Sequence, residues 1–323
     1  MASIGQDILF AKQLLEKGEL VAIPTETVYG LAANALDAVA VSKVFIAKGR
    51  PTFDPLIIHV SSDIQLDRYA KDIPALARKL TKHFWPGPLT LVLNKREAIP
   101  DIVTSGLDTV GIRCPDHYLT QQLLAQLDFP IAAPSANPFG YVSPTTAAHV
   151  NEQLGDKISY ILDGGPCRIG IESTIVGFQQ ELPIVYRRGG IPEEAIERIA
   201  GKLESNLVST SNPKAPGQLE SHYAPRKPFE LGDINSLAAK HKGKKIGVIR
   251  FRKGEFEGPH EYFLSEKGDL AEAAQRLFST LRQLDQTDLD LVIAEKVPDI
   301  GIGKAINDRL MRASAKAPNT ERQ

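Results

Sequence analysis

Short apolar segments alternate along the chain with segments in which apolar residues recur every three or four positions. The apolar segments, bounded by Pro, Gly or Ser, cover 20–24, 55–60, 89–95, 109–115 and 130–137. The periodic segments between them cover 8–16, 37–48, 73–84 and 118–127. Strands interleaved with helices are typical of an α/β domain with a central sheet. Because several strands end in proline, we expect a mixed sheet rather than a regular parallel one.

The composition changes after residue 205. Residues 206–228 are rich in Ser, Pro, Asn and Gly and lack an apolar period, which is typical of a linker or a long functional loop. Beyond them, strand-like segments alternate with helical ones at 244–251, 269–286, 289–297 and 303–314. The chain is therefore predicted to have three parts: a larger domain over 1–205, a connector over 206–228 and a smaller α/β domain over 229–323.

Charge and cysteine content exclude several classes of protein. The 323 residues carry a net charge of −1 and the pI is about 6.7, so any RNA contact is expected to be weak. Cys114 and Cys167 are too few for a disulfide framework and lack zinc-site spacing, which favours a cytoplasmic location. No segment has the length of a membrane span or the pattern of a cleaved leader, so we expect no membrane association.

Two cations flank a glycine in the segment "KGRP", which follows a predicted helix. Lys48 and Arg50 on such a short, rigid turn suit a triphosphate, because Arg offers a bidentate fork and Lys a point charge. A solvated surface turn is an equally good interpretation of so short a motif.

Small polar residues end the predicted strand over 130–137. Ser135 and Asn137 could donate hydrogen bonds to a phosphate or carboxylate, while the flanking prolines hold the backbone still. A nucleophilic serine is rejected, because the Gly-x-Ser-x-Gly elbow is missing and no Asp or His is tied to Ser135 by a recognisable pattern. A plain turn, in which one of these residues caps the next element, remains an alternative.

Other segments allow both a binding and a structural interpretation. Residues 23–31 carry two threonines, a carboxylate and a tyrosine straight after a strand, which indicates either a helix-capping turn or a binding site. His59 lies on an apolar strand and is by default a core histidine. Gly164–Gly165 could form an anion-binding nest of backbone N–H groups or a tight turn. "GIGK" at 301–304 fits no nucleotide-loop spacing and is interpreted as the turn that enters a helix.

Taken together, six segments resemble, in order, the motifs of the YrdC-like family. They are "PTETVYGL", "KGRP…PLIIHV", "FWPGPLTLVL", "VGIRCPDH", "PSANP…SPTTAAHV" and "DGGPCRIGIESTIV". The connector and the second domain resemble the long, two-domain form of that family, the L-threonylcarbamoyladenylate synthases. This resemblance implies a YrdC-like domain with a twisted mixed sheet, followed by a smaller Rossmann-like α/β domain.

The resemblance also assigns residues to three groups. The catalytic group would be Lys48, Arg50, Ser135 and Asn137. The L-threonine group would be Thr27, His59, Arg113, Ala133 and Ser173. The ATP group would be Arg50, Asp54, Thr109, Ser135, Ser143, Arg187 and Tyr223. No protein ligand to a metal is implied, and magnesium would arrive with ATP.

The implied enzyme is a nucleotidyltransferase that acts in tRNA modification. L-Threonine and bicarbonate would give N-carboxythreonine, whose carboxylate attacks the α-phosphate of ATP, so that threonylcarbamoyl-AMP and pyrophosphate result. A downstream tRNA threonylcarbamoyltransferase complex would receive the product. Such chemistry needs positioning and charge neutralisation rather than a protein nucleophile.

Two alternatives from other classes share this fold. One is a non-catalytic RNA-binding module, against which the near-neutral pI counts. The other is a carbamoyltransferase-type maturation enzyme, which normally carries additional zinc-finger and acylphosphatase-like segments for which this chain has neither the cysteines nor the length.

The chain departs from the family pattern in the connector. Leu219, Glu220 and Ser221 replace part of a run that usually contains basic and aromatic residues, and Phe139 stands where a small residue is common. In "RRGG", alignment to the glycine favours Arg187 over Arg188 as the functional arginine. Because a mixed anhydride is readily hydrolysed, we predict that the connector, with Tyr223, closes over the site and excludes water.

Overall fold

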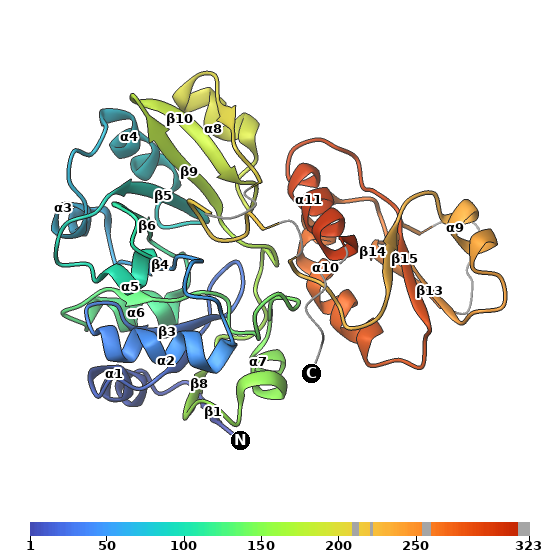
Figure 1. Cartoon of the computed structure of the whole chain (residues 1–323), viewed down its shortest axis with the longest axis horizontal. Coiled ribbons are helices and arrows are strands. Elements are labelled where there is room, and N and C mark those ends of the chain that lie inside the picture. Colours follow the sequence, from blue (N-terminus) through green and yellow to red (C-terminus); the bar gives the residue numbers. More distant parts are fainter. Residues whose placement is uncertain (209–212, 220–221, 254–259, 316–323) are drawn as a thin grey trace.

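The computed structural model describes residues 1–208, 213–219, 222–253 and 260–315, and it contains two α/β units that lie side by side (Figure 1). The larger unit comes from the N-terminal part of the chain, and the smaller unit, drawn orange to red, comes from the C-terminal part. Within these ranges no helix is long and apolar enough to cross a membrane. The predicted α/β fold class is confirmed.

One mixed sheet forms the centre of the larger unit. Its eleven strands follow the spatial order β1-β8-β2-β3-β7-β4-β6-β5-β9-β10-β11. The strand bounds are β1 (Ser3–Gly5), β2 (Val21–Ile23), β3 (Gly30–Asn34), β4 (Ile57–His59), β5 (Leu89–Asn94), β6 (Thr109–Arg113), β7 (Ile131–Ala132), β8 (Tyr160–Leu162), β9 (Thr174–Gln179), β10 (Leu182–Arg187) and β11 (Glu204–Ser205). Neighbouring strands pair antiparallel in β2/β3 and parallel in β4/β6, so the expected mixed sheet is confirmed.

The helices of the larger unit flank this sheet, and the longest coincide with the predicted periodic segments. They are α1 (Ile8–Glu16), α2 (Ala38–Lys48), α3 (Leu66–Tyr69), α4 (Ala75–Phe84), α5 (Asp101–Thr104), α6 (Tyr118–Ala125), α7 (Ala147–Leu154) and α8 (Glu193–Ala200), together with the short 3-10 helix η1 (Asp63–Gln65). Aspartates begin two of them: the Asp7 side chain accepts from the Phe10 N–H and the Asp37 side chain from the Val39 N–H.

The end of α2 shapes the "KGRP" turn. Lys48 is the last helical residue, and Gly49 caps the helix with a left-handed backbone at φ 60°. Glycine adopts this conformation without steric penalty, so the chain reverses within one residue. Lys48 and Arg50 therefore leave the same turn while their side chains remain buried, with exposed fractions of 3% and 8%. The interpretation of this motif as a solvated surface turn is wrong.

The smaller unit has a four-stranded parallel sheet in the order β12-β15-β13-β14. Its elements are β12 (Phe229–Leu231), α9 (Ile234–Lys240), β13 (Ile246–Arg252), β14 (Glu261–Ser265), α10 (Leu270–Asp285), β15 (Leu291–Ala294) and α11 (Gly303–Ser314). β13, α10, β15 and α11 match the predicted segments. The short β12, α9 and β14 were not anticipated, since segments of this length carry little periodicity.

The two units share a buried apolar cluster. Val28, Val142 and Ile171 of the larger unit pack in the same cluster as Phe278 of α10 and Leu310 of α11. Such a shared core holds the units together. The limits of the three predicted parts stay a prediction, and connector residues 209–212 and 220–221 lie outside the described residues.

Candidate active site

A small cavity lies where the ends of several strands meet the connector; we call it the central cavity. It is lined by Val28, Arg50, Ile57, His59, Arg113, Ala133, Pro134, Ser135, Glu172, Ser173, Arg187, Pro216, Gly217, His222 and Tyr223. The structure therefore brings together eight of the predicted site residues: Arg50, His59, Arg113, Ala133, Ser135, Ser173, Arg187 and Tyr223. Its volume is about 50 Å³, which is room for one or two water molecules.

Lys48 supports the wall of the central cavity from behind. Its Nζ donates to the backbone oxygens of Ser135 and Asn137, each at 2.5 Å. Burial lowers the pKa of Lys48 well below its usual range, and the nearby Arg50 guanidinium adds to this effect. The side chain joins the end of α2 to the loop after β7, so it positions Ser135 rather than lining the cavity.

Arg50 is held by its own turn. Its Nη2 lies 3.0 Å from Asp54 Oδ2, and its Nε donates to the Asp54 backbone oxygen at 3.0 Å. Asp54 is fully buried, and burial raises the pKa of its carboxyl although Arg50 opposes this shift. Neither carboxylate oxygen has a hydrogen-bond partner among the described residues, and only Oδ2 is ion-paired with Arg50. Asp54 thus fixes the Arg50 fork and keeps one oxygen available.

The loop after β7 presents Ser135 to the cavity. Asn137 lies behind it, nearly fully buried, and its Nδ2 donates to the backbone oxygens of Pro138 at 2.8 Å and Tyr141 at 2.9 Å. Asn137 therefore shapes the loop and does not line the cavity. Within the part of the chain that the structure describes, no His or Asp side chain bonds to Ser135, in keeping with the rejection of a nucleophilic serine.

Two predicted L-threonine residues are neighbours across the sheet. His59 at the end of β4 is paired in register with Arg113 at the end of β6. Burial, together with the Arg113 charge, lowers the pKa of His59 to about 3, so the imidazole is neutral. Thr27 is fully buried with its Oγ1 2.8 Å from Thr25 Oγ1, and it stands beside the cavity rather than in its lining.

Arg187 and Ser173 are bonded to each other in the lining of the central cavity. Arg187 Nη2 donates to Ser173 Oγ at 3.0 Å, and its Nε donates to the Ser173 backbone oxygen at 3.0 Å. Ser173 Oγ also lies 2.8 Å from Thr90 Oγ1 on β5. Burial lowers the pKa of Arg187 from its ordinary value. Arg188 instead pairs with Glu193 at 3.0 Å and does not line the cavity, so the structure favours Arg187 as the functional arginine.

The connector covers the central cavity. The Tyr223 ring is 1% exposed and stacks on Phe278 of α10 with 5.6 Å between ring centroids. The His222 ring lies edge-on to Phe139 at 5.8 Å, and burial lowers the pKa of His222 well below its usual range. Phe139, the residue that departs from the family pattern, therefore forms part of the surface on which the connector rests.

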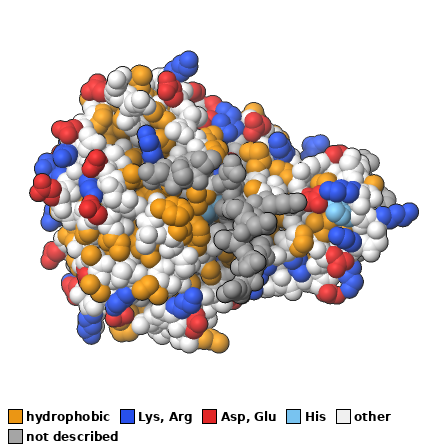
Figure 2. Space-filling model, in the orientation of Figure 1, with side chains coloured by type: hydrophobic (Ala, Val, Ile, Leu, Met, Phe, Trp, Pro, Cys, Tyr) orange, Lys and Arg blue, Asp and Glu red, His pale blue; other side chains and the backbone are white. Residues whose placement is uncertain are grey.

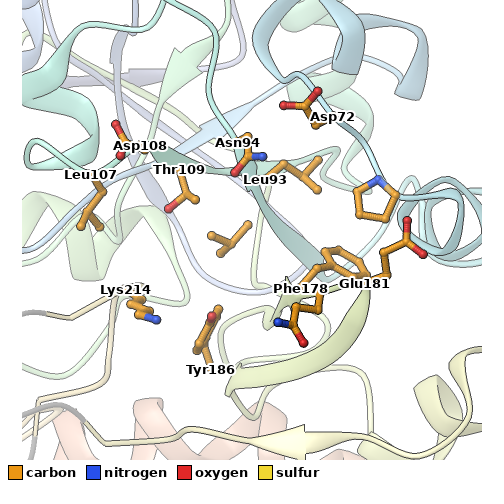
Figure 3. Close-up of a pocket in the computed structure, with 13 residues that line it drawn as sticks. Asp72, Leu93, Asn94, Leu107, Asp108, Thr109, Phe178, Glu181, Tyr186 and Lys214 are labelled. Atoms are coloured by element: carbon orange, nitrogen blue, oxygen red, sulfur yellow. The ribbon is translucent and has the colours of Figure 1, made fainter.

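Thr109 stands apart from the other predicted ATP residues. It lines a second cavity of about 420 Å³ (Figure 3). That cavity is lined by Asp72, Pro74, Val92, Leu93, Asn94, Leu107, Asp108, Thr109, Phe178, Gln180, Glu181, Tyr186 and Lys214. Connector residue Ala215 belongs to one buried apolar cluster with Ile57, which lines the central cavity, and Tyr186, which lines the second. Thr109 and Arg50 therefore line different cavities.

The two weaker motifs have structural roles. In the Gly164–Gly165 turn, the Gly164 N–H donates to the Tyr29 hydroxyl at 3.1 Å and the Gly165 N–H to Asp163 Oδ1 at 2.9 Å. Both amides are therefore bonded to side chains of the protein, the distant Tyr29 and the neighbouring Asp163, which favours the tight-turn interpretation over the anion-binding nest. The segment at 301–304 enters α11, which begins at Gly303, as predicted.

Two family models match the chain. The Sua5/YciO/YrdC model, described as "Telomere recombination", matches residues 13–189. A second model, described as "Threonylcarbamoyl-AMP synthase, C-terminal domain", matches residues 191–315. The chain belongs to the Sua5/YrdC family.

Relatives in the Sua5/YrdC family match nearly the whole chain. The threonylcarbamoyl-AMP synthase of Pyrococcus abyssi is 44% identical, with 95% of this chain and 94% of the relative covered. That of Bacillus subtilis is 41% identical, with 94% and 92% covered. The crystal structure of P. abyssi Sua5 complexed with L-threonine has a TM-score of 0.91 and 43% identity, over 97% of each chain. The predicted family, two-domain form, enzyme class and synthase activity are therefore confirmed.

Two buried carboxylates of this Sua5/YrdC site were not among the residues assigned from the sequence, although Glu26 lies in the 23–31 segment for which a binding site was one interpretation. Glu26, 1% exposed, lies 2.8 Å from Arg113 Nη2 and accepts from the Asp116 N–H at 3.0 Å. Glu172 lines the central cavity and accepts from Ser143 Oγ at 2.6 Å. Ser143 is fully buried behind Glu172 and does not line the cavity. A signal for both existed, since each carboxylate stands beside a threonine or serine at a strand end.

Proposed function

We propose that the central cavity joins L-threonine, bicarbonate and ATP into threonylcarbamoyl-AMP and pyrophosphate for the modification of tRNA. One observation carries this proposal: three buried arginines, Arg50, Arg113 and Arg187, all line the central cavity. Three fixed positive charges suit a substrate carboxylate and a triphosphate, because positioning and charge neutralisation are the main requirements of phosphoryl chemistry.

L-Threonine binds at the Arg113 side of the cavity. Arg113 is oriented by Glu26 and is free to form a charge-assisted pair with the amino-acid carboxylate. The neutral His59 beside it adds a hydrogen-bonding group without adding charge. The Ser173 hydroxyl and the small Ala133 complete the pocket, and Thr27 acts through the turn that it stabilises. That P. abyssi Sua5 was solved in complex with L-threonine supports L-threonine as the amino-acid substrate.

The triphosphate binds at the Arg50 and Arg187 side. Arg50 is prearranged by Asp54, and Ser135 is presented by the loop that Lys48 holds. Ser143 acts through Glu172, to which its hydroxyl donates. Because these groups are fixed before substrate binds, they can stabilise developing charge with little reorganisation.

The reaction proceeds without a covalent enzyme intermediate. Threonine and bicarbonate condense with loss of water to N-carboxythreonine. One oxygen of its new carboxylate forms a bond to the α-phosphorus of ATP, while the bond from that phosphorus to the bridging oxygen breaks. Pyrophosphate leaves with the electron pair, and the arginines balance its charge.

Magnesium is proposed to enter with ATP. In the described ranges no group of three or more His, Cys, Asp or Glu side chains could hold a metal ion by itself. Magnesium commonly uses one or two carboxylates together with substrate phosphates. Asp54 does not line the central cavity, but its carboxylate Oδ1 has no hydrogen-bond partner among the described residues, and we propose it as one such carboxylate. When bound, the ion would neutralise charge on the phosphates.

The connector has to move before substrate can enter. A volume of about 50 Å³ cannot hold ATP, and connector residues Pro216, Gly217, His222 and Tyr223 make up part of the wall. Ala215 packs in one cluster with Ile57 of the central cavity and Tyr186 of the second, and we propose that movement of the connector lets ATP also reach Thr109. We therefore retain Thr109 and Tyr223 as ATP contacts of the loaded enzyme.

The cellular context extends this proposal. Threonylcarbamoyl-AMP is consumed by a tRNA threonylcarbamoyltransferase complex, and the reaction takes place in the cytoplasm. Any contact with RNA is weak, since the net charge is −1 and Figure 2 shows acidic and basic side chains interspersed on the visible face. No observation favours the non-catalytic RNA-binding alternative.

Pyrophosphate release tests the proposed function. The purified chain is supplied with magnesium, ATP, L-threonine and bicarbonate, and each of the last three is omitted in turn. Release should need all of them, and threonylcarbamoyl-AMP should accumulate in equal amount. Release that does not depend on threonine or bicarbonate would refute the proposal.

A further inference from the structure

A residue of the smaller unit reaches the wall of the central cavity. Arg309, on α11, has a fully buried side chain. Its Nε lies 2.9 Å from Glu172 Oε2, its Nη1 2.6 Å from Asp308 Oδ2, and its Nη2 donates to the Arg188 backbone oxygen at 2.9 Å. Its guanidinium carbon stands 4.8 Å from the centre of the Tyr223 ring.

Arg309 therefore contacts two cavity residues that lie far apart in sequence. Glu172 precedes β9 in the larger unit, and Tyr223 belongs to the connector; both line the cavity. The Glu172 carboxylate is shared, since Oε2 takes the Arg309 pair while Oε1 accepts from Ser143 Oγ at 2.6 Å. A continuous path of bonds runs from α11 through Glu172 to Ser143.

The negative charge of Glu172 affects how well the cavity can bind ATP. An unpaired carboxylate on the wall of a buried cavity would repel phosphate oxygens, because the low local dielectric screens such repulsion poorly. Arg309 neutralises Glu172 and at the same time fixes its orientation. Only the planar fork of an arginine can serve Glu172, Asp308, a backbone oxygen and a ring face together; a lysine ammonium cannot.

We propose that Arg309 is a positioning residue of the synthase reaction, through which the C-terminal unit completes the ATP side of the active site. It holds Glu172 so that Ser143 is oriented and the Glu172 charge is hidden from the phosphates, and it holds the Tyr223 ring. This inference rests on the proposed function, in which ATP occupies that side of the cavity.

A purely structural role for Arg309 predicts a different outcome. Other contacts already join the units: Arg282 Nη2 donates to the Val142 backbone oxygen at 2.5 Å, Lys304 lies 2.6 Å from Glu194, and the apolar cluster is shared. If Arg309 only joined the units, its loss would lower Tm and raise KM for ATP and KM for threonine by similar factors. If Arg309 is a positioning residue, its loss should weaken ATP binding much more than threonine binding.

The test uses the full chain with Arg309→Met, Arg309→Lys, Glu172→Gln and the double variant Arg309→Met/Glu172→Gln. Lys304→Met is the matched control, because it removes an ion pair between the units away from Ser143 and Tyr223. KM for ATP, KM for threonine and kcat are measured by pyrophosphate release. ATP binding is measured by calorimetry without threonine, and Tm is recorded for every variant.

Arg309→Met should raise KM and Kd for ATP by at least ~10-fold, with a much smaller change in KM for threonine. Arg309→Lys should have KM and Kd values for ATP between those of the wild type and Arg309→Met. The double variant should bind ATP more tightly than Arg309→Met, because it lacks the unpaired negative charge that Glu172 carries in Arg309→Met. Lys304→Met should keep wild-type values.

Three results would overturn the inference: unchanged ATP affinity in folded Arg309→Met, equal rises in both KM values, or a double variant no better than Arg309→Met. Should Arg309→Met fail to fold, Arg309→Lys and the double variant still allow the effect on ATP affinity to be compared with the effect on KM for threonine. Calorimetry with ATP alone separates this inference from the proposed function, because a wild-type chain that binds ATP yet releases no threonine-dependent pyrophosphate refutes only the latter.

Discussion

Glu26 Oε1 lies 2.8 Å from Arg113 Nη2, and both side chains are buried. The two residues come from different parts of the sheet, the turn before β3 and the end of β6. A buried carboxylate aligns the guanidinium of Arg113, which lines the central cavity. Arg113 is therefore prearranged for an amino-acid carboxylate.

Glu26→Gln should weaken threonine binding. The amide keeps a similar shape but removes the charge that orients Arg113, so we expect KM for threonine to rise at least ~10-fold while KM for ATP stays near the wild-type value. Steady-state pyrophosphate release with each substrate varied in turn gives both constants. Equal effects on the two substrates would show that Glu26 supports the fold rather than the threonine pocket.

Lys48→Ala and Arg50→Ala should each cut turnover by at least about tenfold, by different routes. Arg50 lines the cavity, whereas Lys48 holds the backbone oxygens of Ser135 and Asn137. Lys48→Ala should therefore also lower Tm. Turnover and thermal unfolding are measured together, with the exposed Lys82→Ala as control. Near-normal turnover in both folded variants would show that neither Lys48 nor Arg50 contributes to catalysis.

Serine should be a poorer substrate than threonine. The cavity offers apolar contacts for the threonine methyl group from Val28, Ile57 and Ala133. One methyl group in such a pocket is worth about 1–3 kcal/mol, so kcat/KM should fall by roughly 10- to 200-fold. Competition between the two amino acids at saturating ATP measures the ratio. A ratio near one would contradict a pocket shaped for the methyl group.

Buried neutral histidines should make stability fall in acid. Burial lowers the pKa of His59 to about 3 and of His149 to about 4, and it lowers that of His222 as well. The unfolded chain binds these protons near pH 6.5, so the free energy of unfolding should decrease below that pH, by up to ~1.4 kcal/mol per unit for each histidine. His59→Gln should flatten this slope and the exposed His83→Gln should not. Denaturant unfolding between pH 7 and 4.5 tests this; identical slopes would refute it.

Tyr223→Ala should shorten the lifetime of enzyme-bound threonylcarbamoyl-AMP several-fold, because the connector loses its stacking on Phe278 and water reaches the mixed anhydride. Tyr223→Phe keeps the ring and should behave more like the wild type. Point variants are preferable to a chain ending near Leu207, since that truncation would expose Val28, Val142 and Ile171. Quench experiments with labelled ATP give the lifetime, and no difference between the two variants would exclude a shielding role for the ring.

The sequence by itself determined the fold class, the longest helices and the family. These features depend on information within short segments: apolar period, an Asp at a helix start such as Asp7 or Asp37, and a Gly at a helix end such as Gly49. The order of the motifs identified the candidate residues in the same way. Eight of them meet in one cavity because strand ends collect at the edges of a sheet.

Only the tertiary structure decided what each of these side chains contacts. Lys48 holds a loop that lies 87 positions away instead of lining the cavity, and Thr109 lines a second cavity rather than the central one. Glu172 and Arg309 meet across 137 positions and two units. Local sequence patterns do not predict such pairings, because the burial of these side chains and the distances between them are set only when the sheet, the connector and α11 pack together.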